Sequence, residues 1–121
     1  MSDLMDRYLA VWNETDAGRR RKLVEATFAP GCRYVDPLTD VRGTEALDAA
    51  IGAAQAQLAA LFPGEPLRPV GAVDAHHDVM RFRWGVGGAD PAVIGFDVLV
   101  VDERGLVSSV AGFFDRFPAA G

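Results

Sequence analysis

The spacing of hydrophobic residues changes once along this chain, and that change restricts the fold more than any other feature. Before the Phe62-Pro63-Gly64 segment, apolar residues recur at the three- and four-residue spacing of amphipathic helices. After this segment they alternate with polar residues, which is typical of β-strands. Helices followed by a series of strands predict an α+β fold with the helices packed on one face of a sheet.

Three helices are expected in the N-terminal half. Their apolar faces run from Leu4 to Trp12, from Leu23 to Phe28 and from Leu47 to Leu61. Pro30-Gly31 is expected to end the second helix, because proline and glycine do not continue a helix favourably. Thr44 is expected to cap the third. A short strand, Cys32–Asp36, and a loop, Leu38–Gly43, are predicted between these two helices.

Four longer strands are expected in the C-terminal half. They are Leu67–Ala75, Val79–Val86, Ala92–Val101 and Leu106–Phe114. Glycine-containing turns between the last three strands are typical of hairpins. We therefore expect one domain over residues 1–121, in which a curved, mostly antiparallel sheet wraps as a cone around about three N-terminal helices and leaves an internal pocket.

Composition narrows the classes of function. The 121 residues are 50% hydrophobic, which is enough for one domain with a core. A net charge of −5 argues against nucleic-acid binding, since neutralising phosphates supplies most of that affinity. No apolar run approaches the ~18 residues of a membrane span, and the start of the chain lacks a signal peptide's basic residues. We expect a cytoplasmic protein without membrane contact; its preference for arginine over lysine is typical of GC-rich bacterial genes.

Asp97 is the most informative polar residue. It lies in the Val93–Val101 segment, where the neighbouring residues on both faces of the expected strand are apolar. Its carboxyl group therefore points into hydrocarbon on either face, which is costly for an unpaired charge. Two alternatives follow: an ion pair with Arg81 or Arg83 of the adjacent strand, or a neutral acid that donates a hydrogen bond inside the pocket.

Asp36 and Tyr8 each have a structural and a functional interpretation. Asp36 precedes Pro37, so it is either a turn residue or a general base held at a strand end beside the pocket. Tyr8 lies on the apolar face of the first expected helix, where a buried hydroxyl needs a partner. That partner is a backbone carbonyl if Tyr8 is structural, whereas a catalytic Tyr8 would donate to an oxyanion.

The remaining candidates point to no metal or cofactor. His76 and His77 are adjacent in an expected strand, so their rings point to opposite faces and do not readily bind one ion. We expect a solvated strand end there, with an inward-facing histidine as a proton carrier as the alternative. Cys32 is the only cysteine, which excludes a multi-cysteine zinc site. The sequence contains no glycine-rich phosphate loop.

Four short segments, taken in chain order, form a recognisable set. They are Arg7–Val11, Tyr34–Pro37, Phe96–Gly105 and Val110–Phe114. They resemble the segments of ketosteroid isomerases that carry a catalytic tyrosine, a general-base aspartate, a protonated aspartic acid and the last strand. SnoaL-like cyclases of the same nuclear transport factor 2-like superfamily are similar. The resemblance implies the same conical fold and pocket.

The resemblance also implies a division of roles. Ionised Asp36 would remove a proton α to a carbonyl group, while Tyr8 and protonated Asp97 would hydrogen-bond the enolate oxygen. The implied substrate is a small, largely apolar carbonyl compound that undergoes isomerisation or an aldol-type cyclisation, with no cofactor and no metal. Two tyrosines that support the oxyanion tyrosine in strongly active isomerases fall on Phe28 and Ile51. The expected substrate-binding residues are Trp12, Phe28, Ile51, Phe82, Trp84 and Phe114.

Two other functions are weighed against this one. The first is a non-catalytic module of the same fold that binds a small molecule or dimerises. The second is an epoxide hydrolase, but the last aspartate of that family's Asp-Arg-Asp arrangement falls on Gly112, and Asp115 lies three residues further on. In either case we expect a homodimer through the uncovered sheet face, which would carry arginines and, depending on register, Phe82 or Trp84.

Overall fold

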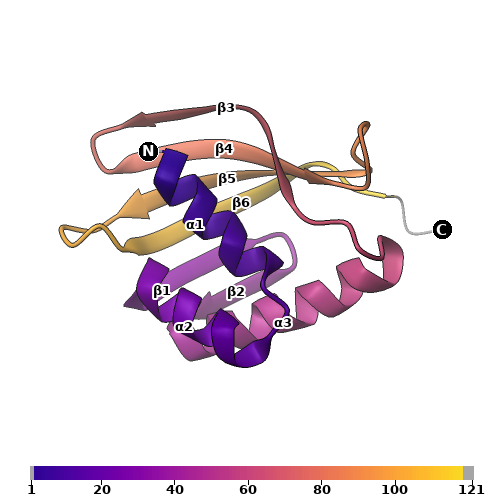
Figure 1. Ribbon diagram of the computed structural model, residues 1–121. Coiled ribbons are helices and arrows are strands. Elements are labelled where there is room, and N and C mark those ends of the chain that lie inside the picture. Colours follow the sequence, from indigo (N-terminus) through magenta and orange to yellow (C-terminus); the bar gives the residue numbers. More distant parts are fainter. Residues whose placement is uncertain (1, 119–121) are drawn as a thin grey trace.

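The computed structural model describes residues 2–118, and its elements follow the predicted order (Figure 1). The helices are α1 (Ser2–Asn13), α2 (Ala17–Thr27) and α3 (Thr44–Leu61). The strands are β1 (Phe28–Asp36), β2 (Thr39–Arg42), β3 (Arg68–His76), β4 (Val79–Val86), β5 (Val93–Val101) and β6 (Val107–Arg116). The predicted α+β class is confirmed. No helix within residues 2–118 is both long enough and apolar enough to cross a membrane.

The six strands form one open, curved sheet in the order β2-β1-β6-β5-β4-β3. All neighbours pair antiparallel except β1 and β6, which run parallel. Helices α2 and α3 pack at the β1–β2 end of the sheet, and α1 contacts β3 at the other end (Figure 1). Because β6 lies between β1 and β5, it brings the N-terminal and C-terminal parts of the sheet together.

The segment between α2 and α3 differs most from the prediction. Phe28 begins β1 instead of ending the helix, and the register between β1 and β6 shifts between Phe28 and Arg33. The Pro30-Gly31 pair therefore lies in an irregular part of a strand, where proline's missing N–H is tolerated. Thr44 does not cap α3, because Gly43 occupies the N-cap position with a φ of +86°. The four-residue strand β2 replaces the predicted loop.

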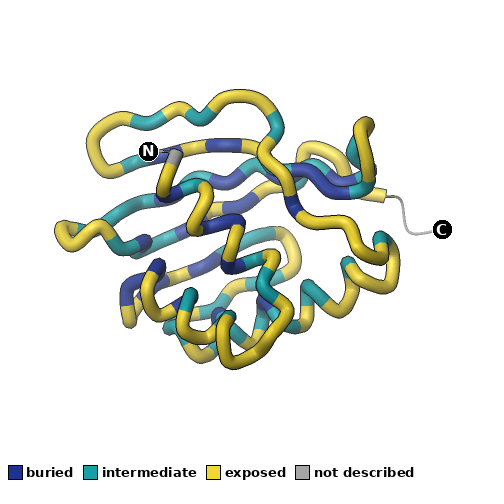
Figure 2. Tube along the Cα trace, in the orientation of Figure 1, coloured by how far each residue is buried: buried dark blue, intermediate teal, exposed yellow. Residues whose placement is uncertain are grey.

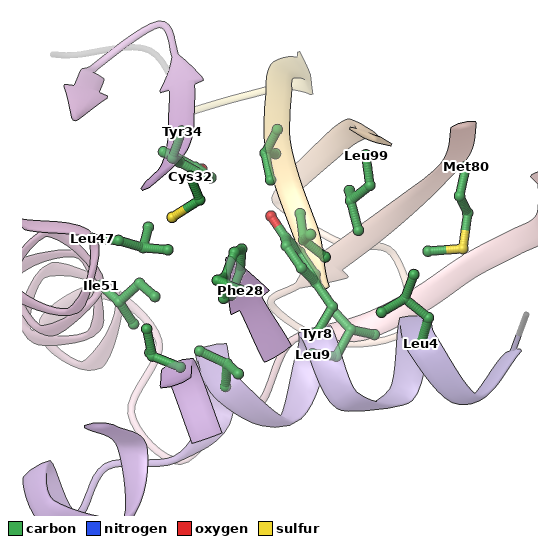
Figure 3. Packing of buried hydrophobic residues seen from close by; sticks show 14 of the residues in the cluster. Leu4, Tyr8, Leu9, Phe28, Cys32, Tyr34, Leu47, Ile51, Met80 and Leu99 are labelled. Atoms are coloured by element: carbon green, nitrogen blue, oxygen red, sulfur yellow. The ribbon is translucent and has the colours of Figure 1, made fainter. Parts of the chain in front are cut away.

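The core lies between the helices and the inner face of the sheet. Buried residues lie within α1, β1, β4, β5 and β6, whereas the edge strand β3 is exposed along most of its length (Figure 2). Figure 3 shows Leu4, Tyr8 and Leu9 of α1 facing Met80 and Leu99 of the sheet. Removing such side chains from water supplies the main driving force for folding, at about 1.5–3 kcal/mol for each large one.

The outer face of the sheet carries charged and aromatic side chains. Arg81 and Arg83 are exposed there, and Phe96 and Phe113 form an edge-to-face pair with ring centroids 6.4 Å apart. Our expectation that Phe82 or Trp84 would lie on this face is wrong. Successive side chains on β4 point to opposite faces of the sheet. Because Arg81 and Arg83 point outward, Phe82 and Trp84 point inward.

We propose that this outer face joins two copies of the chain. It carries two arginine–aspartate pairs, Arg81–Asp74 and Arg83–Asp115, and an exposed Phe113. Positive and negative side chains are therefore both available to a second copy related by a two-fold axis. Sedimentation velocity should show a dimer for the parent and a monomer for Phe113→Glu. Arg21→Glu adds an acidic group on the exposed side of α2 and should remain dimeric. A monomeric parent at high micromolar concentration would contradict this assembly.

Candidate functional site

A cavity of about 360 Å³ opens between α3, the end of β1 and the inner face of the sheet. Its wall is mostly apolar, with a few polar groups contributed by β1, β2, β4 and α3. The lining residues are Trp12, Tyr34, Asp36, Leu38, Thr39, Ala50, Ala53, Ala54, Gln57, Leu58, Leu61, Leu67, Trp84, Val93, Phe114 and Phe117. Its size and apolar lining with few polar groups are typical of small-molecule sites.

Asp36 is the acidic group of the cavity wall. Its Oδ2 accepts a hydrogen bond from the Tyr34 hydroxyl at 2.6 Å, and its Oδ1 accepts one from the Leu38 backbone N–H at 2.8 Å. The second bond closes the turn at Pro37, so the structural interpretation of Asp36 holds together with its position in the cavity. Both oxygens of Asp36 thus accept hydrogen bonds.

Asp97 is the second carboxyl group, and it is only 3% exposed. Its Oδ2 accepts hydrogen bonds from the Tyr8 hydroxyl at 2.8 Å and from the Trp84 indole N–H at 3.1 Å. Burial raises the pKa of Asp97 to about 7, although these two hydrogen bonds act in the opposite direction, and the nearby Asp36 raises the pKa further. Asp97 thus holds its proton at pH values where an ordinary aspartate has lost it.

The alternative in which Asp97 pairs with an arginine is wrong. Arg81 lies 3.2 Å from Asp74, and Arg83 lies 3.0 Å from Asp115, both on the outer face of the sheet. Asp97 points to the inner face because it is the register partner of the inward-facing Phe82. The carboxyl group is therefore held by neutral donors.

Tyr8 is fully buried, and its hydroxyl donates to a carboxyl group instead of a backbone carbonyl. Burial, followed by the proximity of Asp97, raises the pKa of Tyr8 well above its usual value. We expected Tyr8, Asp36 and Asp97 to line one pocket, but only Asp36 belongs to the cavity wall. Tyr8 and Asp97 form a buried pair that adjoins the wall through Trp84, which contacts both the cavity and Asp97.

Gly112 brings the two carboxyl groups close together. A Cβ atom at this position would lie 2.9 Å from Oδ1 of Asp97 and 3.2 Å from Cβ of Asp36. The absence of a side chain on β6 therefore makes room for the Asp97 carboxyl group from β5 and for the Asp36 side chain from β1. An epoxide-hydrolase aspartate would have no room here, and Asp115 pairs with Arg83 on the opposite face.

Gly112→Ala is therefore expected to destabilise the protein by about 1–3 kcal/mol, as overpacking of a filled site does. The added methyl group must displace the Asp97 carboxyl or the β1 backbone, since Val35 O is also only 3.5 Å away. Urea unfolding monitored by tryptophan fluorescence measures the change. Gly31→Ala is the matched control, because its Cβ would meet nothing within 4 Å. Equal effects of the two substitutions would contradict the crowding at Gly112.

The six predicted substrate-binding residues divide into two groups. Trp12, Trp84 and Phe114 lie in the cavity wall. The prediction is wrong for the other three, which are packed in the core: Phe28, Ile51 and Phe82. Figure 3 shows Phe28 and Ile51 among the core side chains between the helices. Phe28 and Phe82 contact the Tyr8 ring, with centroid distances of 5.9 and 5.4 Å, so they support the tyrosine and not a ligand.

Sequence reasoning missed Tyr34 and Gly95. Tyr34 precedes Asp36 by two positions, so strand alternation places both side chains on the same face, and this signal was available. Gly95 is opposite Trp84 in the β4–β5 register, and a Cβ there would overlap the Trp84 indole. Glycine at this position allows the indole to lie across β5 and reach Asp97, which only the register reveals.

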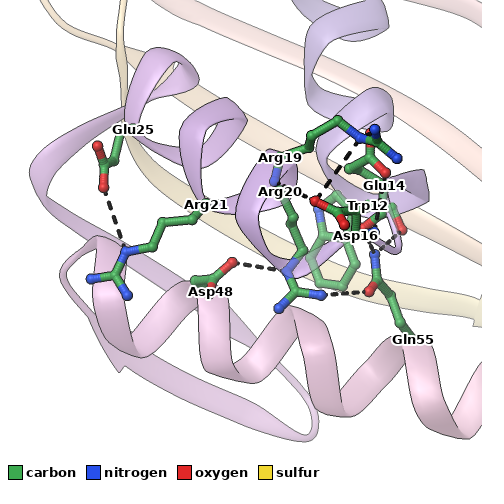
Figure 4. Close-up of polar contacts among 9 residues, drawn as sticks. All are labelled: Trp12, Glu14, Asp16, Arg19, Arg20, Arg21, Glu25, Asp48 and Gln55. Atoms are coloured by element: carbon green, nitrogen blue, oxygen red, sulfur yellow. Dashed lines mark hydrogen bonds and ion pairs between the residues drawn. The ribbon is translucent and has the colours of Figure 1, made fainter.

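A polar network fixes the end of α1 that carries Trp12 (Figure 4). The Gln55 amide donates to the backbone carbonyls of Trp12 and Glu14 at 3.0 and 2.7 Å, and its carbonyl accepts from Arg20 at 2.8 Å. Arg20 also pairs with Asp48 at 2.8 Å. Within residues 2–118, the Trp12 indole nitrogen is the one buried side-chain polar atom without a hydrogen-bond partner.

The two histidines lie away from the cavity. They are exposed at the β3–β4 hairpin, and their ring centroids are 5.6 Å apart. They are therefore not proton carriers for the cavity described above. In the described part of the chain, no group of three or more histidine, cysteine or acidic side chains is placed to hold a metal ion.

Comparison with known proteins places the fold and the family. The sequence matches no protein-family model and no curated protein. In fold it is similar to a candidate ketosteroid isomerase from Kribbella flavida, at 22% identity and a TM-score of 0.67 over 98% of this chain and 82% of that one. It is likewise similar to a candidate polyketide cyclase from Sinorhizobium meliloti, at 17% identity and a TM-score of 0.67 over 91% and 93% of the two chains.

A higher similarity identifies the family within this fold. A candidate isomerase of the SnoaL-like family from Agrobacterium tumefaciens shares 36% sequence identity with a TM-score of 0.83, over 93% of this chain and 95% of that chain. The fold is that of nuclear transport factor 2-like proteins, as the sequence resemblance implied. The chain belongs to the SnoaL-like family.

Proposed function

We propose that this protein is a cofactor-free acid–base enzyme that acts on a small, largely apolar carbonyl compound. One observation carries the proposal: a carboxylate in the wall of an apolar cavity adjoins a second carboxyl group whose burial keeps it protonated up to about pH 7. Two acids whose environments separate their protonation states are suited to act as base and acid in one reaction.

The proposed roles follow from these positions. Asp36, which faces the cavity, takes a proton from the carbon next to the substrate carbonyl, and the electrons of that C–H bond move onto the carbonyl oxygen. Tyr8 and protonated Asp97 donate hydrogen bonds to the resulting enolate oxygen. Asp36 then returns the proton to another carbon, which gives an isomer. If the carbanion instead attacks a second carbonyl, the product is a ring.

Access to the donors sets a condition on this mechanism. Tyr8 and Asp97 are buried next to the cavity and do not form its wall, and the single O–H of Tyr8 already donates to Asp97, so it must turn from Asp97 to the enolate oxygen during the reaction. Substrate binding must therefore displace part of the wall at Trp84 or Tyr34 before the carbonyl oxygen reaches the pair. A cavity that only binds its ligand would need no such movement, which favours a binding module as the second candidate.

An exchange experiment separates the two functions. The protein is incubated with 2-tetralone in deuterium oxide, and loss of the α-proton signals is followed by NMR. The enzyme proposal expects exchange well above the buffer rate, inhibited by 2-naphthol, a planar phenol that mimics the enolate. If 2-naphthol binds by calorimetry while exchange stays at the buffer rate for 2-tetralone and for other enolisable bicyclic ketones, the protein is a binding module.

A further inference from the structure

Trp84 lies where the cavity adjoins the buried acid. Its indole ring is part of the cavity wall, and its N–H donates to Oδ2 of Asp97 at 3.1 Å. Tyr8 donates to the same oxygen at 2.8 Å from the other element, α1. The second oxygen, Oδ1, lies on the side of Gly112 that adjoins Asp36. The two oxygens of Asp97 thus have different environments.

This asymmetry determines where the proton of the neutral acid resides. A carboxyl oxygen has two lone pairs, and two hydrogen bonds from Tyr8 and Trp84 occupy both of those on Oδ2. With Tyr8 as the donor in its bond to Oδ2, the proton of Asp97 is on Oδ1. It faces Gly112 and Asp36, which is the side of the cavity that carries the base.

Gly95 holds the indole in the position that this arrangement needs. Trp84 and Gly95 are register partners, and the next inward pair along the two strands is Phe82 and Asp97. Because any Cβ at Gly95 would overlap the indole ring, the ring lies flat across β5 only with glycine there. The N–H is thereby aimed two residues along the strand at Asp97.

We propose that Trp84 is a positioning residue: by occupying Oδ2 of Asp97, it directs the acid's proton to Oδ1, toward Asp36 and the cavity. The importance of that direction for catalysis rests on the proposed function, whereas the orientation itself does not. The titratable groups that face Asp97 are Tyr8 on α1 and Tyr34 and Asp36 on β1. The β4 arginines point to the outer face.

Titration of Asp97 by carbon-13 NMR of its carboxyl group tests the proposal in the full chain. Trp84→Phe removes a donor to the charged form, so the midpoint should rise by about one pH unit. Gly95→Ala retains Trp84 but displaces its ring, and should raise the midpoint in the same direction. Phe117→Leu is the control, because Phe117 also lines the cavity but has no polar atom to bond Asp97 or its two donors, and it should leave the midpoint unchanged.

The outcomes distinguish the two proposals. If Trp84→Phe titrates like the parent, or Phe117→Leu shifts the midpoint as much, Trp84 does not position Asp97. The 2-tetralone exchange of the parent is measured separately. Exchange by the parent without a shift in Trp84→Phe would overturn the positioning role alone, whereas a shift without exchange in the parent would overturn the proposed function alone.

Discussion

We compare the free energy of unfolding of Asp97→Asn with that of the parent at two pH values. The difference, variant minus parent, is expected to be about 4 kcal/mol larger at pH 7 than at pH 4. The folded protein holds the proton of Asp97 up to a pKa of about 7, against an ordinary value of 3.8. Between these values the unfolded chain loses the proton and the folded chain keeps it. The parent's free energy of unfolding therefore falls as pH rises through this window, while the asparagine variant lacks that loss.

The geometry favours asparagine as the replacement. Its amide oxygen can accept the two hydrogen bonds from Tyr8 and Trp84, so neither buried donor is left unpaired. Urea unfolding at a series of pH values gives the free energy of unfolding of the variant and of the parent. In the difference between the two, the contributions of most other carboxyl groups cancel. Asp74→Asn, which removes an exposed carboxylate on the outer face, should not change with pH in this way. Parallel curves for Asp97→Asn and the parent would show that Asp97 has the same pKa in the folded and the unfolded chain.

Asp36→Asn is expected to reduce deuterium exchange of 2-tetralone by roughly 10²–10⁴-fold, the usual contribution of a positioned general base. The amide cannot take the proton, although its oxygen can still accept the hydrogen bond from Tyr34. Affinity for 2-naphthol should be unchanged or higher, because a negative charge next to the phenol oxygen is removed. Loss of exchange with retained binding is therefore the expected combination.

The control for this substitution is Asp40→Asn on the neighbouring strand β2. Asp40 is exposed, pairs with Arg33 at 3.0 Å and is not part of the cavity wall. Its removal should leave both exchange and binding close to the parent. If Asp36→Asn exchanges as fast as Asp40→Asn, another group is the base, and the binding-module interpretation becomes the better one.

The fold was predictable because its long elements have clear hydrophobic periods. The segment from Phe28 to Arg42 was less predictable, because its structure depends on distant partners. Phe28 takes part in β1 through its pairing with Val107 of β6, although local spacing assigns it to a helix. Strand β2 is a short, largely polar edge strand, so no alternation of apolar and polar residues predicts it.

The apolar surroundings of Asp97 were predictable, but its hydrogen-bond partners were not. An aspartate inside an apolar strand must be paired or neutral, and this reasoning applies to Asp97 without any coordinates. Whether Asp97 is paired or neutral depends on which face of β5 points to the core. The same register places the arginines of β4 on the outer face, out of reach of Asp97. The contact between Trp84 and Asp97 depends on cross-strand register, which a single sequence does not encode locally.

The central position of β6 in the sheet has a consequence for how the protein is made. Asp36 is synthesised before most of the sheet, yet the glycine that lets it approach Asp97 lies in β6, the last strand of the described residues. Without β6, the sheet is divided into a β2-β1 pair and a β5-β4-β3 group with no hydrogen bonds between them. A nascent chain still lacking its last strand has both acids but cannot assemble them. Strand β6 must therefore be synthesised before this arrangement of Asp36 and Asp97 can form.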